Sequence, residues 1–276
     1  MTTTDHQFSV TRSGQNLVDE IHAETGLSKS RIKDAMTKGA VWMARNGKTR
    51  RIRRAKFPVE PGDVLAIYYS EKILADVPPE PTLIEDKKQY SVWYKPAGLL
   101  SSGSRYGDHC AINRWIEKAL QKPVFLVHRL DRFATGLIVV AHSKHTAAQL
   151  SRQFKDRETK KIYRVIVKGT PESDFTINQK LDDKEAISHV SPLESHEGVS
   201  LLSVRIETGR KHQIRRHLAD AGYPVLGDRQ YGDGSYPELQ LCAVGLGFNC
   251  PIGGEAVYWE LPTHYHPGIG APGRLQ

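Results

Sequence analysis

Short apolar stripes with helical spacing dominate the first seventy residues of the chain. One stripe covers residues 17–21, and a second begins after Ser28, a residue type favoured at helix N-caps, and ends at Gly39. Apolar runs follow at 40–43 and 64–69, and a Pro-Gly-Asp turn precedes the second run. The pattern therefore predicts two helices followed by two strands.

Beyond residue 88, apolar runs and alternating segments predict strands and helices in an irregular order. Strands are expected at 90–94, 124–127, 137–141, 160–168 and 199–207. Helices are expected at about 111–120 and at 212–221, and a third follows the Asp131 segment with Ala147, Leu150 and Phe154 on its inner face. Between the two parts, prolines cluster in the segment that starts at Asp76, and proline resists both helix and sheet. We therefore expect an N-terminal domain over 12–75, a stiff linker over 76–88 and a second domain over 89–276.

Composition narrows the class of protein. The 276 residues carry a formal net charge of +8 and 39% apolar residues, which suffices for a sizeable core and favours a polyanionic partner. The three cysteines lack C-x-x-C spacing, so neither a disulfide framework nor a zinc ribbon is indicated. The N-terminus lacks a signal-peptide pattern and no apolar run approaches eighteen residues, which predicts a soluble cytoplasmic protein.

A basic run between Arg45 and Lys56 holds seven basic residues and no acid. Such a run is often only a solvated surface. The helix after Ser28 also presents lysines and an arginine, which favours a surface that contacts phosphate groups. Such contacts supply affinity and register rather than base specificity. The candidate contact residues are Arg50, Arg51, Arg53 and Arg54.

A charged turn, His128-Arg-Leu-Asp131, stands between two apolar runs that are expected to be buried strands. Burying a lone carboxylate costs free energy, so Asp131 needs either a cationic partner or a chemical role. The alternative is a turn aspartate that caps backbone amides.

Four further motifs accompany this turn between residues 90 and 260. They are K-P-A-G-L at 95–99, K-I-Y-R-V at 161–165, T-G-R-K-H-Q-I-R at 208–215, and G-Y-P-V-L-G-D at 222–228 followed by Y-G at 231–232. With H-R-L-D and the A-T-G-L at 134–137, this ordered set resembles the motifs of the RluA-type pseudouridine synthases. Members of that family isomerise uridines in ribosomal or transfer RNA by breaking the N1–C1′ bond and reattaching the base through C5.

The resemblance implies a role for several side chains. Asp131 would be the catalytic carboxylate, Arg215 its ion-pair partner, and Tyr163 the ring beneath the flipped base. Arg129 would reach towards the RNA stack, because extruding a nucleotide costs a few kcal/mol that a side chain in the gap can offset. Leu218 would line the pocket, and Lys95, in the first motif, would contact substrate. Each also has a structural alternative: surface charge for Arg215 beside Arg216, core packing for Tyr163 and Leu218, and a turn salt bridge for Arg129.

The same resemblance implies the fold and the partners. We expect an α+β protein whose catalytic domain is a bent, largely antiparallel mixed sheet with flanking helices, joined to a small α/β domain at the N-terminus. Isomerisation requires no redox change, so neither a cofactor nor a metal is expected. The partner would be structured RNA, and the protein is expected to be a monomer. The order of bond-making steps and the identity of the target uridine stay open.

The N-terminal part resembles the small S4-like RNA-binding domain shared with a ribosomal small-subunit protein. The similarity comprises L-S-K-S-R-I at 27–32, N-G-K at 46–48 and V-E-P-G-D-V at 59–64. It departs at residues 42–45, where the family usually reaches N-G-K sooner after its first strand.

Two other interpretations remain. Departures from the family pattern, at Ala134, Lys211, Cys242 and Cys250, leave room for an inactive RNA-binding protein of the same fold. The intact set of Asp131, Tyr163 and Arg215 argues against it. A metal-dependent hydrolase could use His142-x-x-His145 and His264-x-His266, but neither pair has a nearby carboxylate in a metal-ligand arrangement.

Overall fold

The computed structural model describes residues 3–12 and 16–269, and the chain divides into two compact units. The N-terminal unit comprises Met1–Pro78 and Ser102–Ala119, and the C-terminal unit comprises Pro79–Ser101 and Leu120–Gln276.

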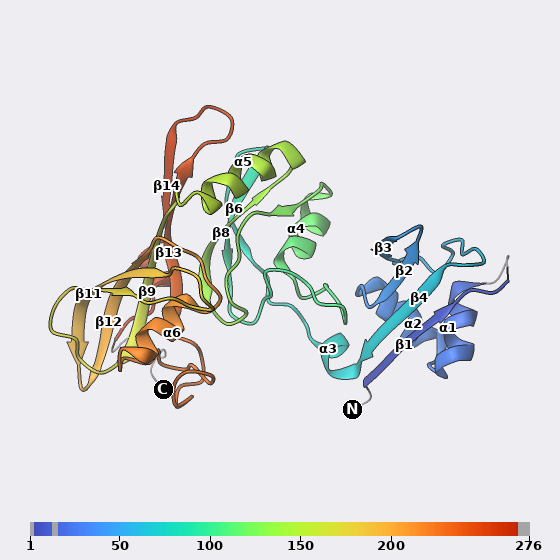
Figure 1. Ribbon diagram of the computed structural model, residues 1–276, viewed down its shortest axis with the longest axis horizontal. Coiled ribbons are helices and arrows are strands. Elements are labelled where there is room, and N and C mark those ends of the chain that lie inside the picture. Colours follow the sequence, from blue (N-terminus) through green and yellow to red (C-terminus); the bar gives the residue numbers. More distant parts are fainter. Residues whose placement is uncertain (1–2, 13–15, 270–276) are drawn as a thin grey trace. The chain divides into compact units, whose positions relative to one another are not determined.

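The N-terminal unit is a four-stranded antiparallel sheet covered on one face by two helices (Figure 1). Its strands stand in the order β1 (Thr3–Ser9), β4 (Val64–Ser70), β2 (Val41–Arg45) and β3 (Lys48–Arg51). The helices of the unit are α1 (Leu17–Thr25), α2 (Lys29–Thr37), α3 (Glu71–Ala75) and most of α4 (Ile112–Leu120).

Side-chain caps and an apolar face fix the first two helices. The Asn16 side chain accepts a hydrogen bond from the Val18 amide, and the Ser28 hydroxyl accepts one from the Arg31 amide. The apolar stripes of α1 and α2 are fully buried together with alternate residues of β2 and β4. The two helices, the two strands and the Ser28 cap predicted from the sequence are therefore confirmed.

The C-terminal unit is built on a ten-stranded mixed sheet. Along its main path the order is β10, β11, β12, β9, β13, β8, β6 and β5, with β14 paired to β13 and β7 paired to β8. The strands are β5 (Thr82–Asp86), β6 (Tyr90–Lys95), β7 (Phe125–Leu126), β8 (Thr135–Ala141), β9 (Lys160–Lys168), β10 (Phe175–Asn178), β11 (Ile187–His196), β12 (Val199–Ile206), β13 (Leu241–Asn249) and β14 (Ala256–Glu260). The helical elements are α5 (Lys144–Lys155), α6 (Gln213–Asp220) and the short 3₁₀ helix η1 (Thr263–Tyr265). Among these described strands only β13 and β8 pair in parallel, so the expected α+β, largely antiparallel fold is confirmed.

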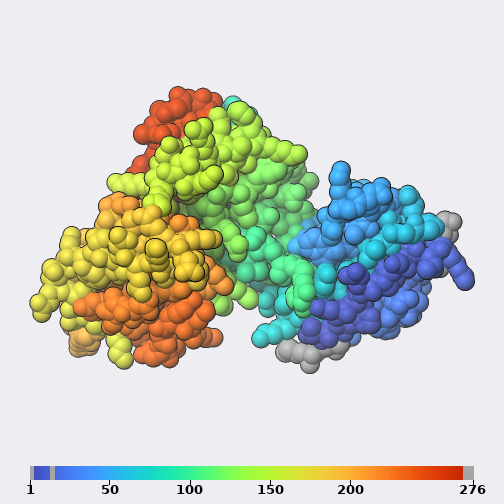
Figure 2. All heavy atoms as spheres, viewed as in Figure 1, coloured from blue at the N-terminus to red at the C-terminus, as the bar shows by residue number. Residues whose placement is uncertain are grey.

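Two apolar cores lie along this sheet. One gathers side chains of β6, β8, β13 and α5, and the other gathers side chains of β9, β12 and α6. Polar contacts also attach α6 to β11: the Gln213 amide donates to the Ile187 carbonyl, and His217 lies 3.0 Å from the Ser188 hydroxyl. In Figure 2 the orange segment that contains α6 lies directly below the yellow strands.

A glycine permits the parallel contact at the centre of the sheet. Gly136 begins the buried part of β8 and pairs with Ala243 of β13. A Cβ atom at this position would overlap the Ala243 carbonyl oxygen, and the φ of +115° disfavours any other residue. The A-T-G motif therefore ends in a glycine because two strands meet there at backbone distance.

The structure divides the chain differently from the expected boundaries. The segment 76–88, expected to be a linker, contains β5, which pairs with β6 because its Thr-Leu-Ile run favours a strand once the prolines end. Residues 102–119, expected within the second domain, belong to the N-terminal unit, where the Asp108 carboxylate contacts Arg51 and Arg53.

Candidate active site

The candidate site forms around Asp131, in the loop between β7 and β8. Its neighbour Leu130 is tied at both backbone groups to one hydroxyl, because Ser101 Oγ donates to the Leu130 carbonyl at 2.7 Å and accepts from the Leu130 amide at 2.9 Å. The Asp131 carboxylate is 27% exposed. A rigid loop therefore presents a partly accessible carboxylate.

Arg215 on α6 bridges Asp131 to a second carboxylate. Its Nη1 donates to Asp131 Oδ2 at 3.0 Å, while Nε and Nη2 form a two-bond fork to Asp228 at 2.7 and 2.8 Å. The guanidinium is 10% exposed and also lies over the Tyr231 ring, 5.1 Å from its centroid. The predicted pairing of Arg215 with Asp131 is thus present, across 84 residues of sequence.

Asp228 anchors this bridge, although sequence reasoning did not single it out. The carboxylate is buried and accepts the Gln230 and Tyr231 amides in addition to Arg215. Burial acts to raise the pKa of Asp228, but these hydrogen bonds outweigh it and hold the pKa below its ordinary value. The only sequence signal for this role was the closing aspartate of G-Y-P-V-L-G-D.

His212 completes the ring of polar groups. It begins α6 in the left-handed conformation, with φ of 54°, and its Nε2 faces Asp131 Oδ1 at 3.8 Å. Burial lowers the pKa of His212, the charge of Asp131 opposes this, and Arg215 lowers it further, so the ring is neutral at pH 7. A neutral ring protonated on Nε2 can face Asp131 while Nδ1 accepts from the Tyr231 hydroxyl at 3.0 Å. His212 was also missed from the sequence, although the T-G-R-K-H-Q-I-R motif contains it.

Lys95 holds the Asp131 loop through contacts of its ammonium group with backbone carbonyls. The side chain is fully buried, and its Nζ lies 3.0, 2.8 and 3.1 Å from the carbonyl oxygens of Pro96, Leu99 and Arg132. Burial lowers the pKa of Lys95 to about 7, although the charge of Asp131 opposes this shift. Because all three ammonium donors face backbone carbonyls, Lys95 joins the K-P-A-G-L turn to the Asp131 loop and offers none of them to a substrate.

Tyr163 and Leu218 belong to the apolar core that β9, β12 and α6 share, and neither lines the cavity at Asp131. Tyr163 on β9 is half-buried, and burial together with the charge of Asp131 raises the pKa of its hydroxyl well above the ordinary value. The phenol therefore stays protonated at neutral pH. Leu218 is buried and packs in the same core. Arg129, by contrast, is exposed.

His128 has a structural place. Its Nε2 accepts from the Val139 amide at 3.0 Å, its ring stacks on Phe154, and burial lowers its pKa to about 3.

The site opens into a cavity of about 570 Å³. Asp131, His212, Arg215 and Asp228 line it, together with the exposed Phe133 and Arg132. A cavity of this volume can accept a nucleotide-sized ligand. The predicted residues Asp131 and Arg215 and the missed residues Asp228 and His212 are thus brought to one concave surface.

The basic residues expected to contact phosphate belong to the N-terminal unit and are not equivalent. Arg51 and Arg53 both contact the Asp108 carboxylate. Arg51 also donates to the Gly39 and Ser104 carbonyls. Arg50 lies over the Phe57 ring, and Arg54 is exposed. Two of the four guanidiniums therefore hold their own unit together.

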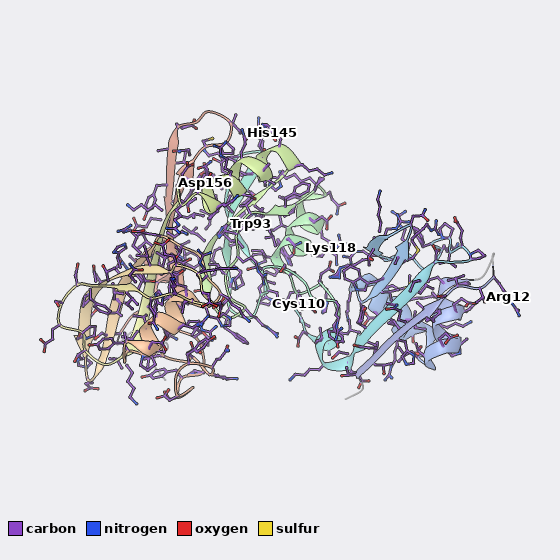
Figure 3. The ribbon with its side chains drawn as sticks, viewed as in Figure 1. Arg12, Trp93, Cys110, Lys118, His145 and Asp156 are labelled. Atoms are coloured by element: carbon purple, nitrogen blue, oxygen red, sulfur yellow. The ribbon has the colours of Figure 1, made fainter. Side chains whose placement is uncertain are left out.

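The histidines considered as metal ligands contact different groups. His142 lies 2.8 Å from the Ser91 hydroxyl, whereas His145 is exposed on α5 (Figure 3). His266 contacts the Leu261 carbonyl. Within residues 3–12 and 16–269, no group of three His, Cys, Asp or Glu side chains is placed to hold a metal ion.

No helix in the described part of the chain is both long and apolar enough to cross a membrane.

The sequence matches those of known proteins. Residues 89–220 match the family model described as RNA pseudouridylate synthase. An RNA pseudouridine synthase of Aquifex aeolicus is 31% identical, with 85% of each chain covered. The ribosomal large subunit pseudouridine synthase D of Neisseria meningitidis serogroup A is 32% identical over 70% of this chain and 61% of its own. The tRNA pseudouridine synthase C of Vibrio parahaemolyticus is 30% identical over 59% of this chain and 78% of its own.

The fold has solved counterparts as well. Human RNA pseudouridylate synthase domain containing 4 superimposes with a TM-score of 0.57 at 24% identity, covering 66% of this chain and 88% of that one. Human RNA pseudouridylate synthase domain containing 1 superimposes with the same TM-score at 21% identity, covering 68% of this chain and 85% of that one. With the Aquifex relative matched along most of both chains, this protein belongs to the RNA pseudouridine synthase family and is an isomerase.

Proposed function

We propose that the protein converts uridines of ribosomal or transfer RNA to pseudouridine, with Asp131 as the catalytic carboxylate. The observation that carries the proposal is the bridge from Asp131 through Arg215 to the buried Asp228, at the wall of a nucleotide-sized cavity. Relatives named for large-subunit ribosomal RNA and for transfer RNA support both substrate classes.

Arg215 is hydrogen-bonded more fully to Asp228 than to Asp131, and this leaves Asp131 suited to react. Arg215 gives two hydrogen bonds to Asp228 and one to Asp131, so Asp131 has a cationic partner without a fork that would occupy both of its oxygens. An ionised carboxylate can attack the sugar or the base, or remove a sugar proton. The N1–C1′ bond breaks, the uracil turns in place, C5 bonds to C1′, and the hydrogen on C5 is lost while N1 gains one.

Tyr163 would support the detached base. Its phenol is protonated at neutral pH and lies near enough to Asp131 for the carboxylate charge to affect its pKa. A protonated phenol can donate a hydrogen bond or a proton to an electron-rich uracil, and its ring offers a stacking surface. Arg129, exposed at the same turn, would occupy the position that the extruded nucleotide leaves in the RNA.

The N-terminal unit would act as an S4-like RNA-binding domain of a monomeric cytoplasmic enzyme. Its α2 carries exposed Lys29, Arg31 and Lys33 on the side away from the core. The opposite side of α2 is buried, so these cations would face the RNA, whose phosphates would displace the exposed ion pairs of Lys29 with Asp19 and of Arg31 with Glu71.

The test of catalysis is tritium release from RNA that contains 5-tritiated uridine. Asp131→Asn keeps the shape of the side chain but cannot act as a nucleophile or base, so we expect release to stop while RNA binding persists. Asp182→Asn removes an exposed carboxylate that pairs with Arg216, and should leave release unchanged. Turnover of Asp131→Asn above about a tenth of wild type would contradict the assignment. Absence of release from the wild type on total cellular RNA would favour an inactive RNA-binding protein.

The substrate is identified by mapping pseudouridines in RNA from a strain that lacks the gene. We expect at least one position in ribosomal or transfer RNA to revert to uridine and to be restored by the wild type but not by Asp131→Asn. Reversion confined to other RNA classes would contradict the proposed substrate.

A further inference from the structure

The sheet of the N-terminal unit has a second, uncovered face. Along β2 and β4, residues that point to α1 and α2 alternate with residues that point away, as strand geometry requires. Val41, Met43 and Leu65 are fully buried on the helix side, whereas Trp42 and Tyr68 are only half-buried on the other side.

This outer face is hollowed into a groove of about 380 Å³. Its floor consists of small side chains, because Ala44 pairs with Val64 and Trp42 pairs with Ala66 across the two central strands. Trp42, Tyr68 and Arg105 are the large side chains that border it. An apolar floor between two aromatic rings has the shape and chemistry that a flat ring system requires.

Cations are arranged on the aromatic rings of this face. The Arg51 guanidinium lies 4.1 Å from the centroid of the Trp42 ring. Arg105 lies 5.0 Å from the Tyr68 ring and 4.9 Å from the Tyr106 ring. The Trp42 indole donates to the Arg105 carbonyl at 2.9 Å, which fixes the loop that carries Arg105 against the sheet. The rings and charges therefore belong to one ordered surface.

Arg105 is suited to bind an anion. Its side chain is 57% exposed and forms an ion pair with Asp5, which is 39% exposed, at 3.2 Å. Exposed ion pairs of this kind contribute little to stability, so a phosphate can replace the Asp5 carboxylate as the partner of Arg105. Gln7 and Thr49, which also line the groove, add polar groups that can reach the edge of a base.

We propose that this groove binds an unpaired nucleotide of RNA, with the base on the Ala44–Ala66 floor between Trp42 and Tyr68 and the phosphate at Arg105. The positive charge of the chain and the guanidiniums on this face favour a polyanion over a peptide or a second copy. The proposal rests on the RNA substrate of the proposed function, but not on the role of Asp131. The enzyme would thereby hold a single-stranded segment at a second place, distinct from the cavity that accepts the target uridine and from the cations of α2.

The test is the affinity of the full chain for a labelled ten-nucleotide oligoadenylate, measured by fluorescence anisotropy. This probe stacks well and contains no uridine for the active site. Thr49→Glu places a carboxylate at the groove and should weaken binding about 10-fold, equivalent to about 1.4 kcal/mol. Ala23→Glu adds the same negative charge on the exposed side of α1, outside the groove and outside the cations of α2, and should stay within about twofold of wild type. The reverse order of effects would overturn the proposal in favour of the helices.

Two further variants separate stacking from folding. Trp42→Phe keeps an aromatic ring and should retain most of the affinity, whereas Trp42→Ala should lose it, with thermal unfolding used to verify that both variants fold. Ultraviolet cross-linking should join the oligonucleotide to peptides that contain Trp42 or Tyr68. Cross-links confined to peptides of the C-terminal unit, or a concentration-dependent dimer that Thr49→Glu abolishes, would overturn the proposal.

The outcome is independent of catalysis. Asp131→Asn should bind oligoadenylate like the wild type, and Thr49→Glu should retain the wild-type rate of tritium release at saturating RNA. If Thr49→Glu leaves oligoadenylate affinity unchanged while the wild type still releases tritium, only the groove proposal fails. The effect of Asp131→Asn on tritium release tests the active site and not the groove.

Discussion

At the residue scale, the arrangement depends on how one guanidinium serves two carboxylates. Arg215 is nearly buried, Asp228 is buried, and Asp131 is partly exposed. The two-bond fork to Asp228 fixes the plane of the guanidinium, and that plane sets where its remaining donor meets Asp131. Asp228 therefore positions Arg215 against Asp131, the carboxylate that we propose to react.

Arg215 and the adjacent Arg216 provide a matched pair of substitutions. Arg215→Met leaves a buried carboxylate without its counter-charge, so we expect kcat/KM for tritium release to fall about 100-fold or more. Arg216 forms an ion pair with Asp182, whose side chain is 66% exposed, so Arg216→Met should change kcat/KM by no more than about twofold. Equal losses in the two variants would show that the bridge has no special part in the reaction.

The depressed pKa of Asp228 predicts how stability depends on pH. A carboxylate whose folded-state pKa lies below its unfolded value stabilises the fold above the unfolded pKa, near 4, and loses this contribution as pH falls through the folded value. Asp228→Asn should lower the free energy of unfolding by about 3 kcal/mol at pH 7, because the partner Arg215 stays buried. In urea unfolding the difference between variant and wild type should shrink below about pH 4. A constant difference from about pH 7 to about pH 3 would contradict this linkage.

At the element scale, the parallel contact between β8 and β13 positions the end of the Asp131 loop. Gly136→Ala would bring a Cβ atom against the Ala243 backbone at positive φ, and neither strand can yield without breaking its pairing. We expect a loss of about 3 kcal/mol or more in the free energy of unfolding, from the backbone conformation and the overlap together. Gly209→Ala, where the structure offers open space, is the control and should change stability by less than about 1 kcal/mol. Similar losses in both variants would mean that the strand contact tolerates a side chain.

Helices and strands that could be predicted from the sequence have a regular apolar period, and the strand that could not be predicted lacks one. The sequence predicted α1, α2, β6, β8, β9, β12 and α6 because each has a regular apolar period and end signals in its own residues. β13 is equally buried but was not predicted, since its alternate glycines replace the side chains that would show a period. At Gly245 the Tyr258 hydroxyl of β14 occupies that space, which only the folded sheet reveals.

Some residues of the candidate site could likewise be predicted from the sequence, and others could not. The motif resemblance gave the pairing of Arg215 with Asp131, and the structure contains that ion pair. It did not single out Asp228 or His212, because their importance arises from hydrogen bonds to Arg215 and Tyr231 that no spacing encodes. It also gave Lys95 as a substrate contact, whereas burial under the Asp131 loop turns its donors to backbone carbonyls. The catalytic roles themselves stay predictions.

At the scale of the whole molecule, two roles can be proposed for the N-terminal unit: to bind RNA only, or to bind RNA and also shape the reaction. Its basic run contains two kinds of arginine. Arg51 and Arg53 contact Asp108 within the unit, whereas Arg50 and Arg54 are exposed and form no ion pair with any residue that the structure describes. Only the second kind can exchange solvent for RNA phosphate without disturbing the fold.

Neutralising Arg50 and Arg54 to Gln should therefore weaken RNA binding and flatten its salt dependence, by roughly 0.7 to 0.9 in the log–log slope for each phosphate that the variant no longer binds. The rate of tritium release at saturating RNA should change little, because an interaction made equally in the ground state and the transition state alters KM and not kcat. Arg51→Gln with Arg53→Gln is the contrasting pair: it strips Asp108 of both cations and should lower the unfolding temperature of the N-terminal unit before it alters the salt slope. If the Arg50 and Arg54 variant instead lost its saturated rate while its affinity held, the N-terminal unit would be placing the target uridine in the cavity, and binding and chemistry could not be assigned to separate units.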